Sequence, residues 1–191
     1  GDAAPGQPTP GWWDQIVGPG RIIDTERYYV VAANVLGGCQ GSTGPASLAP
    51  DGAPWGSRFP VISTRDQVRA EALLSDLLGI HTWDIVVGTS LGGHRAIEWA
   101  VTYPERVRRL VVVASGAQTT ADQAAWTHTQ IRAIELDPAW RGGDYYAGPG
   151  PNAGLALARQ IAHTTYRSPS ELDERFGRIP QNDEDPLHGG R

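Results

Sequence analysis

Short apolar runs alternate with helical patterns through the first 115 residues. Tyr28–Ala33, Trp83–Val87 and Leu110–Ala114 are continuous β-prone runs, typical of strands that are buried on both faces. Apolar residues at helical spacing predict one helix from a Ser63-Thr64 cap to Gly79 and another over Leu91–Thr102. Strands and helices that alternate with short links predict right-handed crossovers and a parallel sheet, which is an α/β fold.

The pattern changes after Ala117, where helical segments follow one another with no strand between them. The last of the three begins at Ser168 with Glu171 three residues later, which predicts a capping box. The three predicted helices cover about Ala121–Leu136, Ala153–Tyr166 and Pro169–Phe176. We therefore divide the chain into a partial α/β core, residues 1–117, and the beginning of a helical cap (lid), residues 118–191.

Composition limits the classes of partner. The 191 residues are 40% hydrophobic and 19% charged, as in a globular protein. A net charge of −5 gives no electrostatic reason to expect nucleic acid or a membrane surface, and no apolar run reaches the roughly 18 residues that cross a bilayer. The single cysteine, Cys39, cannot form an internal disulfide, so we expect a cytoplasmic protein.

Two features suggest that the sequence is a piece of a longer one. It contains no methionine, and it opens with the Gly/Pro-rich stretch GDAAPGQPTPGWWD. Removal of an initiator or a targeting segment would explain the first feature alone. Truncation explains both.

The chemistry is indicated by Gly88-Thr89-Ser90-Leu91-Gly92, which lies between a predicted strand and the following helix. That is the context of the G-x-S-x-G nucleophile elbow, in which a sharp turn exposes the serine at the top of a sheet. Gly88 and Gly92 are predicted to leave room for the turn, and the Leu91 backbone N–H to stabilise an oxyanion. A glycine-rich turn with an ordinary N-capping serine is the alternative.

The chain closely resembles the homoserine O-acetyltransferase family, a branch of the α/β hydrolases. The resemblance covers nearly the whole length and departs from the family at the elbow, where glycine and methionine are usual in place of Thr89 and Leu91. The matching strings are Gly11-Trp12-Trp13-Asp14, Gly18-Pro19-Gly20, Asn34–Cys39 with Gly41–Pro45, Arg65-Asp66-x-Val68-Arg69-Ala70, Glu98-Trp99-Ala100, Gly142–Tyr146 and Asp183–Leu187.

The resemblance implies acyl transfer in two steps, as in methionine biosynthesis. Ser90 would take an acetyl group from the co-substrate acetyl-CoA and pass it to the hydroxyl of homoserine. The family holds the amino acid's carboxylate with a cap arginine, followed seven residues later by a tyrosine. Arg159 and Tyr166 match that spacing, on one helical face with His163. We expect no permanently bound cofactor and no metal, because no metal-ligand spacing is present.

The acid and the base of the triad are not assigned. The resemblance places them beyond Arg191, so His81, His94, His128, His163 and His188 are interpreted as packing or surface residues. It also implies that a strand preceding Tyr28–Ala33 in the chain is missing, which leaves a gap in the sheet between Tyr28–Ala33 and the nucleophile strand. We therefore expect other segments of the same fold as partners, an isolated chain that neither folds well nor turns over, and a homodimer, as is usual in the family.

Alternatives stay open at this stage. An esterase or thioesterase would use the same elbow with water as the acceptor, and a related transferase would acylate another hydroxyl, such as that of serine. The missing acid and base also leave open a catalytically inert fragment or a binding module.

Overall fold

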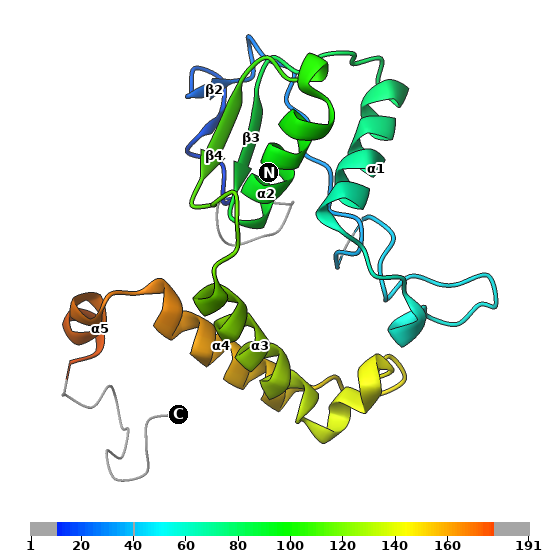
Figure 1. Cartoon of the computed structure of the whole chain (residues 1–191), viewed down its shortest axis with the longest axis vertical. Helices are drawn as coiled ribbons and strands as arrows, with labels where there is room; N and C mark the ends of the chain where they lie inside the picture. Colours follow the sequence, from blue (N-terminus) through cyan, green and yellow to red (C-terminus); the bar gives the residue numbers. More distant parts are fainter. Residues whose placement is uncertain (1–10, 40, 178–191) are drawn as a thin grey trace.

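Two parallel strands form the centre of the computed structural model, which describes residues 11–39 and 41–177 (Figure 1). Strand β3 (Val86–Thr89) pairs with β4 (Leu110–Val113), with Val86 opposite Leu110. The predicted parallel sheet is confirmed. The strand predicted from Trp83 is interrupted, since Trp83 forms an isolated bridge with Val107 and regular pairing begins only at Val86.

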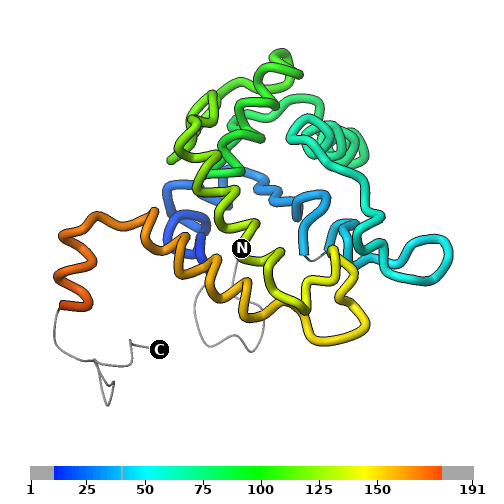
Figure 2. The backbone as a smooth tube through the Cα atoms, turned by 60° about the horizontal axis from the view of Figure 1, so that its bottom comes forward, coloured from blue at the N-terminus to red at the C-terminus, as the bar shows by residue number. Residues whose placement is uncertain are grey.

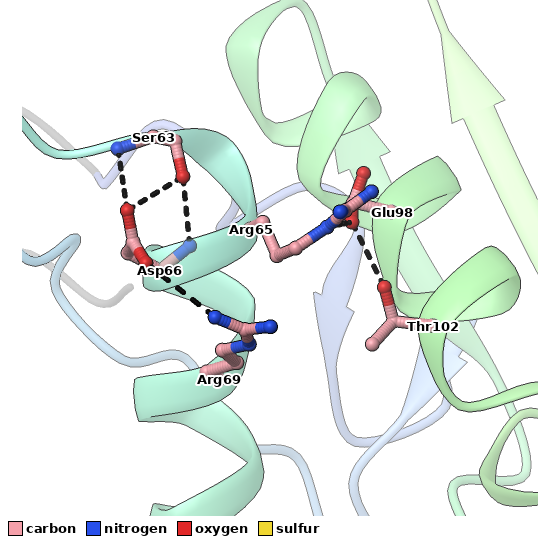
Figure 3. A network of polar contacts seen from close by, with 6 residues as sticks. All are labelled: Ser63, Arg65, Asp66, Arg69, Glu98 and Thr102. Carbon is pink, nitrogen blue, oxygen red and sulfur yellow. Dashed lines mark hydrogen bonds and ion pairs between the residues drawn. The ribbon is translucent and has the colours of Figure 1, made fainter.

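Helices α1 (Thr64–Leu77) and α2 (Leu91–Thr102) confirm the two helices predicted in the core. Ser63 caps α1 in a reciprocal capping box with Asp66, and Gly79 follows its end at φ 71°, a conformation that glycine adopts freely. Figure 3 shows this box, with Arg69 near the Asp66 carboxylate. After α2 the chain passes through the short helix η2 (Pro104–Arg106) into β4.

The hydrophobic core lies between α1, α2 and the sheet. Its buried members are Val68, Ala72 and Trp99, against which Trp83, Val86, Tyr103 and Val107 pack. Polar contacts join the two helices around this core. The indole N–H of Trp99 donates to Glu71 (2.7 Å), which is also paired with Arg95, and Arg65 on α1 pairs with Glu98 on α2 (Figure 3). Burial lowers the pKa of the Arg95 guanidinium.

The N-terminal part differs from the prediction. Residues 11–39 contain one short parallel pair, β1 (Val17–Gly18) with β2 (Ile23–Asp24), and the strand predicted over Tyr28–Ala33 is wrong. Among the described residues no neighbouring strand pairs with that segment, and a strand is stable only when its backbone groups are paired.

The three helices predicted for the second part are confirmed as α3 (Ala121–Glu135), α4 (Asn152–Tyr166) and α5 (Pro169–Phe176). The 3-10 segment η3 (Pro138–Gly143) follows α3. Helices α3 and α4 meet along small residues. The backbone of Gly154 approaches α3 so closely that a Cβ there would lie 2.6 Å from the Ala133 carbonyl oxygen. The capping box predicted at α5 forms only in part: Ser168 accepts from the Glu171 N–H, while the Glu171 carboxylate pairs with Arg167.

Helices α3 and α4 lie beyond the carboxyl ends of β3 and β4 (Figure 1). A separate contact ties this part to the core, where η1 (Gly56–Arg58) lies beside η3 (Figure 2). The Asp144 carboxylate accepts from the backbone N–H and the hydroxyl of Ser57, each at 2.8 Å. The bond from the Ser57 backbone N–H has the larger effect and the bond from its hydroxyl the smaller, and both lower the pKa of the Asp144 carboxyl below its usual value.

Some expectations fall on residues that the structure does not describe. The Gly/Pro-rich opening stretch through residue 10 and the acidic tail Gln181–Pro186 with His188 lie outside the described residues. Within the described ranges, no helix has the length and apolar character that crossing a membrane requires.

Candidate active site

Ser90 occupies the turn between β3 and α2 with a strained backbone. Its φ of 52° and ψ of −121° lie in a region that residues with a side chain rarely adopt. The turn is held from both sides, because the Ser90 N–H donates to Val113 O on β4 (3.0 Å) while the Ser90 carbonyl accepts from Gly93 N (2.9 Å). The side chain is exposed, and its hydroxyl makes no hydrogen bond within the described residues. This is the geometry predicted for a nucleophile elbow.

Two glycines make this turn possible, and only one of them is the predicted one. A Cβ on Gly88 would collide with the carbonyl oxygen of Gly92 in the first turn of α2. The prediction for Gly92 itself is wrong in the described structure, since a Cβ there would have no atom within 4 Å. The second close approach is at Gly93, where a Cβ would lie 2.6 Å from the Ser115 Cβ.

Leu91 is the first residue of α2, where backbone N–H groups have no partner inside the helix. Its N–H has no acceptor among the described residues. A free N–H at a helix N-terminus, next to an exposed hydroxyl, is suited to stabilise negative charge that develops on an oxygen nearby. The Leu91 side chain is itself more than half exposed.

Ser115 was not singled out in the sequence. It lies two residues after the end of β4, and its hydroxyl donates to the Ser90 carbonyl at 2.6 Å, with Val113 O as a second, longer acceptor at 3.2 Å. The available signal was the pair Gly92-Gly93, since the elbow pattern requires only one glycine after the serine and a second one indicates a further close approach.

Arg159 and Tyr166 lie on α4, both exposed. Arg159 makes no hydrogen bond or ion pair with the other described residues. The Tyr166 ring is in edge contact with His163, at 6.4 Å between centroids. No side-chain hydrogen bond links either residue, or any described histidine, to Ser90; His94 donates only its backbone N–H to the Ser90 carbonyl (3.3 Å). The structure thus places both residues on α4 and brings neither into contact with the elbow.

Comparison with known proteins fits this geometry. Residues 10–190 match the sequence family described as the alpha/beta hydrolase fold. The chain belongs to the α/β-hydrolase fold family. Its strand–turn–helix unit around Ser90 has the context in which that fold carries the nucleophile elbow.

Within this family the resemblance to homoserine O-acetyltransferases is confirmed. The chain is 62% identical to the homoserine O-acetyltransferase of Thermobifida fusca in an alignment 193 residues long. The alignment covers all of this chain and 51% of that protein. Its structure superposes with a TM-score of 0.86 on the homoserine O-acetyltransferase of Bacillus anthracis, at 32% identity. The superposition covers 92% of this chain and 49% of that one. An esterase structure gives a TM-score of 0.88 at 33% identity, with 97% and 52% covered. The chain spans about half the length of the curated relatives it matches.

Proposed function

We propose that this chain forms the nucleophile-bearing part of an acyltransferase that moves an acetyl group from acetyl-CoA to the hydroxyl of homoserine, a step toward methionine. The complete protein, by which we mean this chain together with the segment that carries the triad acid and base, performs the reaction. The observation that carries the proposal is the strained, exposed Ser90 beside the free Leu91 N–H, in a chain 62% identical to a homoserine O-acetyltransferase.

The reaction proceeds in two balanced steps. The Ser90 Oγ attacks the thioester carbonyl while a base removes its proton, and the oxyanion that forms is stabilised by the Leu91 N–H. The C–S bond then breaks, and the CoA thiolate leaves with the proton that the base held. In the second step the homoserine hydroxyl attacks acetyl-Ser90, its proton passes to the base, and Ser90 leaves as the restored hydroxyl.

The acceptor is held, in this proposal, by Arg159 and Tyr166. An exposed guanidinium without an acidic partner among the described residues is free to take the α-carboxylate of the amino acid in a bidentate contact. The phenol of Tyr166, two helical turns further along the same face of α4, adds a hydroxyl near that carboxylate. These residues would therefore determine acceptor affinity rather than the chemistry on Ser90.

The uncovered side of the sheet supports the need for further segments. Tyr28–Ala33 is unpaired, and Val111 on β4 is 43% exposed, although both have the sequence of buried strands. We propose that the companion segment inserts a strand beside β3, supplies the acid and the histidine base, and yields a cytoplasmic homodimer.

An esterase is the second candidate, favoured by the superposition on an esterase structure at a TM-score of 0.88. It would use the same Ser90 and Leu91, with water in place of homoserine. The two functions differ in what happens to the acyl-enzyme, so they can be separated by following product and CoA together.

The test is to incubate the complete protein with acetyl-CoA, with and without homoserine, and to measure free thiol and O-acetylhomoserine. We expect thiol release that depends on homoserine and matches the ester formed. Ser90→Ala should lower the rate by about 10⁴-fold or more. Arg159→Met should raise the KM for homoserine with little change in the KM for acetyl-CoA, and Arg132→Met, an exposed arginine of α3, is the matched control. Thiol release at an equal rate without homoserine would favour the esterase.

A further inference from the structure

The carbonyl of Ser90 is held by a side chain from another strand end. The Ser115 hydroxyl, 25 residues away in sequence, donates to this oxygen at 2.6 Å. The Gly93 and His94 N–H groups donate to it as well, at 2.9 and 3.3 Å, as expected for the first turn of a helix. The bond from Ser115 is the one that the helix does not supply by itself.

This carbonyl belongs to the same peptide unit as the Leu91 N–H. Because the peptide bond is planar and trans, the N–H of Leu91 points opposite to the carbonyl of Ser90. Whatever fixes the direction of the carbonyl therefore fixes the direction of the free N–H. Hydrogen bonds to the carbonyl also polarise the peptide unit and strengthen its N–H as a donor.

The surroundings of Ser115 place its hydroxyl at this carbonyl. Ala114 turns the chain at the end of β4 with φ 53°, a conformation that is costly for a residue with a Cβ. Ser115 then lies against Gly93, whose missing side chain provides the space, because a Cβ there would lie 2.6 Å from the Ser115 Cβ. The strained backbone of Ala114 and the absence of a side chain at Gly93 together allow the Ser115 hydroxyl to reach the Ser90 carbonyl.

We propose that Ser115 is a positioning residue that holds the Ser90–Leu91 peptide unit in the orientation in which the Leu91 N–H meets the oxyanion. The inference rests on the proposed function, since it requires Ser90 to be the nucleophile. Ser115 contacts no substrate. It acts through the peptide unit that carries the oxyanion donor.

The role predicts a specific kinetic signature for Ser115→Ala in the complete protein. Losing an oxyanion donor outright lowers kcat by 10²–10³-fold, so loosening one should lower kcat by about tenfold. The KM for acetyl-CoA and for homoserine should stay within about twofold, because the interaction strengthens only in the transition state. Ser115→Thr, which keeps the hydroxyl, should retain most of the activity.

A boronic acid gives a second readout. Methylboronic acid adds to the serine Oγ and places an oxygen where the oxyanion forms, so its affinity should fall about as much as kcat in Ser115→Ala. The affinity for CoA should not change. Thr129→Val, which removes a comparable hydroxyl-to-carbonyl bond (3.0 Å, to Ala125 O) on α3, should change neither affinity nor kcat.

The outcomes separate the two proposals. A Ser115→Ala variant with unchanged kcat and boronate affinity would overturn the positioning role. So would a variant in which both KM values rise and the unfolding midpoint falls together with kcat, because that is a general structural defect. So would a Ser115→Thr variant as impaired as Ser115→Ala. The proposed function is tested separately by Ser90→Ala: if that variant still forms O-acetylhomoserine, Ser90 is not the nucleophile, whatever Ser115 does.

Discussion

Both faces of the β3–β4 pair carry apolar side chains, but one face is covered by helices and the other is exposed in the described structure. One face is covered by α1 and α2, with Val68 and Ala72 buried against Trp99. On the other side Val111 and Val113 remain exposed, and the apolar segment Tyr28–Ala33 pairs with nothing in the described structure. Each face was expected to be buried, since both strands read as continuous apolar runs.

The difference between the two faces shows that a face is covered when its packing partners lie nearby in the sequence. The covering helices follow directly after and between the strands they cover, so their partners are a few residues away. The other face has no such neighbour in sequence, and its valines stay exposed among the described residues. The elbow lies at the end of the covered unit, where its backbone is held by α2 and β4.

The largest effect is expected on the covered face. Trp99→Ala in the complete protein should lower the free energy of unfolding by about 3–5 kcal/mol, because it removes a buried ring and leaves the Glu71 carboxylate without its indole donor. Trp99→Phe, which keeps a ring and loses the N–H, should cost about 1–2 kcal/mol. Urea denaturation measures both. Equal costs for the two variants would contradict the packing account.

A smaller effect is expected at the tie between the two parts of the chain. Asp144→Asn should weaken the contact with Ser57 and increase proteolysis near residues 138–150 several-fold. Because the pKa of Asp144 is lowered in the folded state, the tie is present above the ordinary aspartate pKa and is lost as the pH falls through the lowered value.

Limited proteolysis at decreasing pH measures this. The wild-type segment should become susceptible below about pH 4, while Asp144→Asn should show the same susceptibility across that window. A wild-type segment that stays protected at low pH would show that another contact holds the two parts together.

The smallest effect separates the two faces most sharply. In the complete protein, Val111→Thr should lower the free energy of unfolding by about 1–3 kcal/mol, since a hydroxyl would be buried without a partner. At a site that stayed as exposed as Val111 is in the described structure, the cost would be less than about 0.5 kcal/mol. Hydrogen exchange of the β4 amides measures the cost. A cost below about 0.5 kcal/mol in the complete protein would mean that nothing covers this face.

Elements with local partners were predictable. The bounds of α2 and α5 agree with the sequence pattern, and Gly88 and the strained Ser90 agree with the elbow motif. Sequence could not show that Tyr28–Ala33 would lack a partner strand, because strand propensity carries no information about the neighbour. It also could not distinguish Gly92 from Gly93, since their difference lies in the approach of Ser115 from β4.

Function was predictable to a different degree at each residue. The role of Ser90 rests on a motif with a defined strand–turn–helix context, which the structure contains. The roles of Arg159 and Tyr166 rest on a spacing that matches the resembled family, and the structure brings neither into contact with the elbow. Ser115 was missed because a serine after a strand has no distinctive pattern until its carbonyl partner is known.

The central claim is that Ser90 carries the acyl group, and peptide-resolved mass spectrometry tests it directly. The complete protein is mixed briefly with acetyl-CoA, quenched in acid and digested, with Ser90→Ala treated alongside. The account predicts a single acetyl group on the peptide that contains Ser90, absent from the variant and removed when homoserine is added before the quench. An unmodified Ser90 peptide under conditions in which CoA is released, or acetylation that persists in Ser90→Ala, would contradict it.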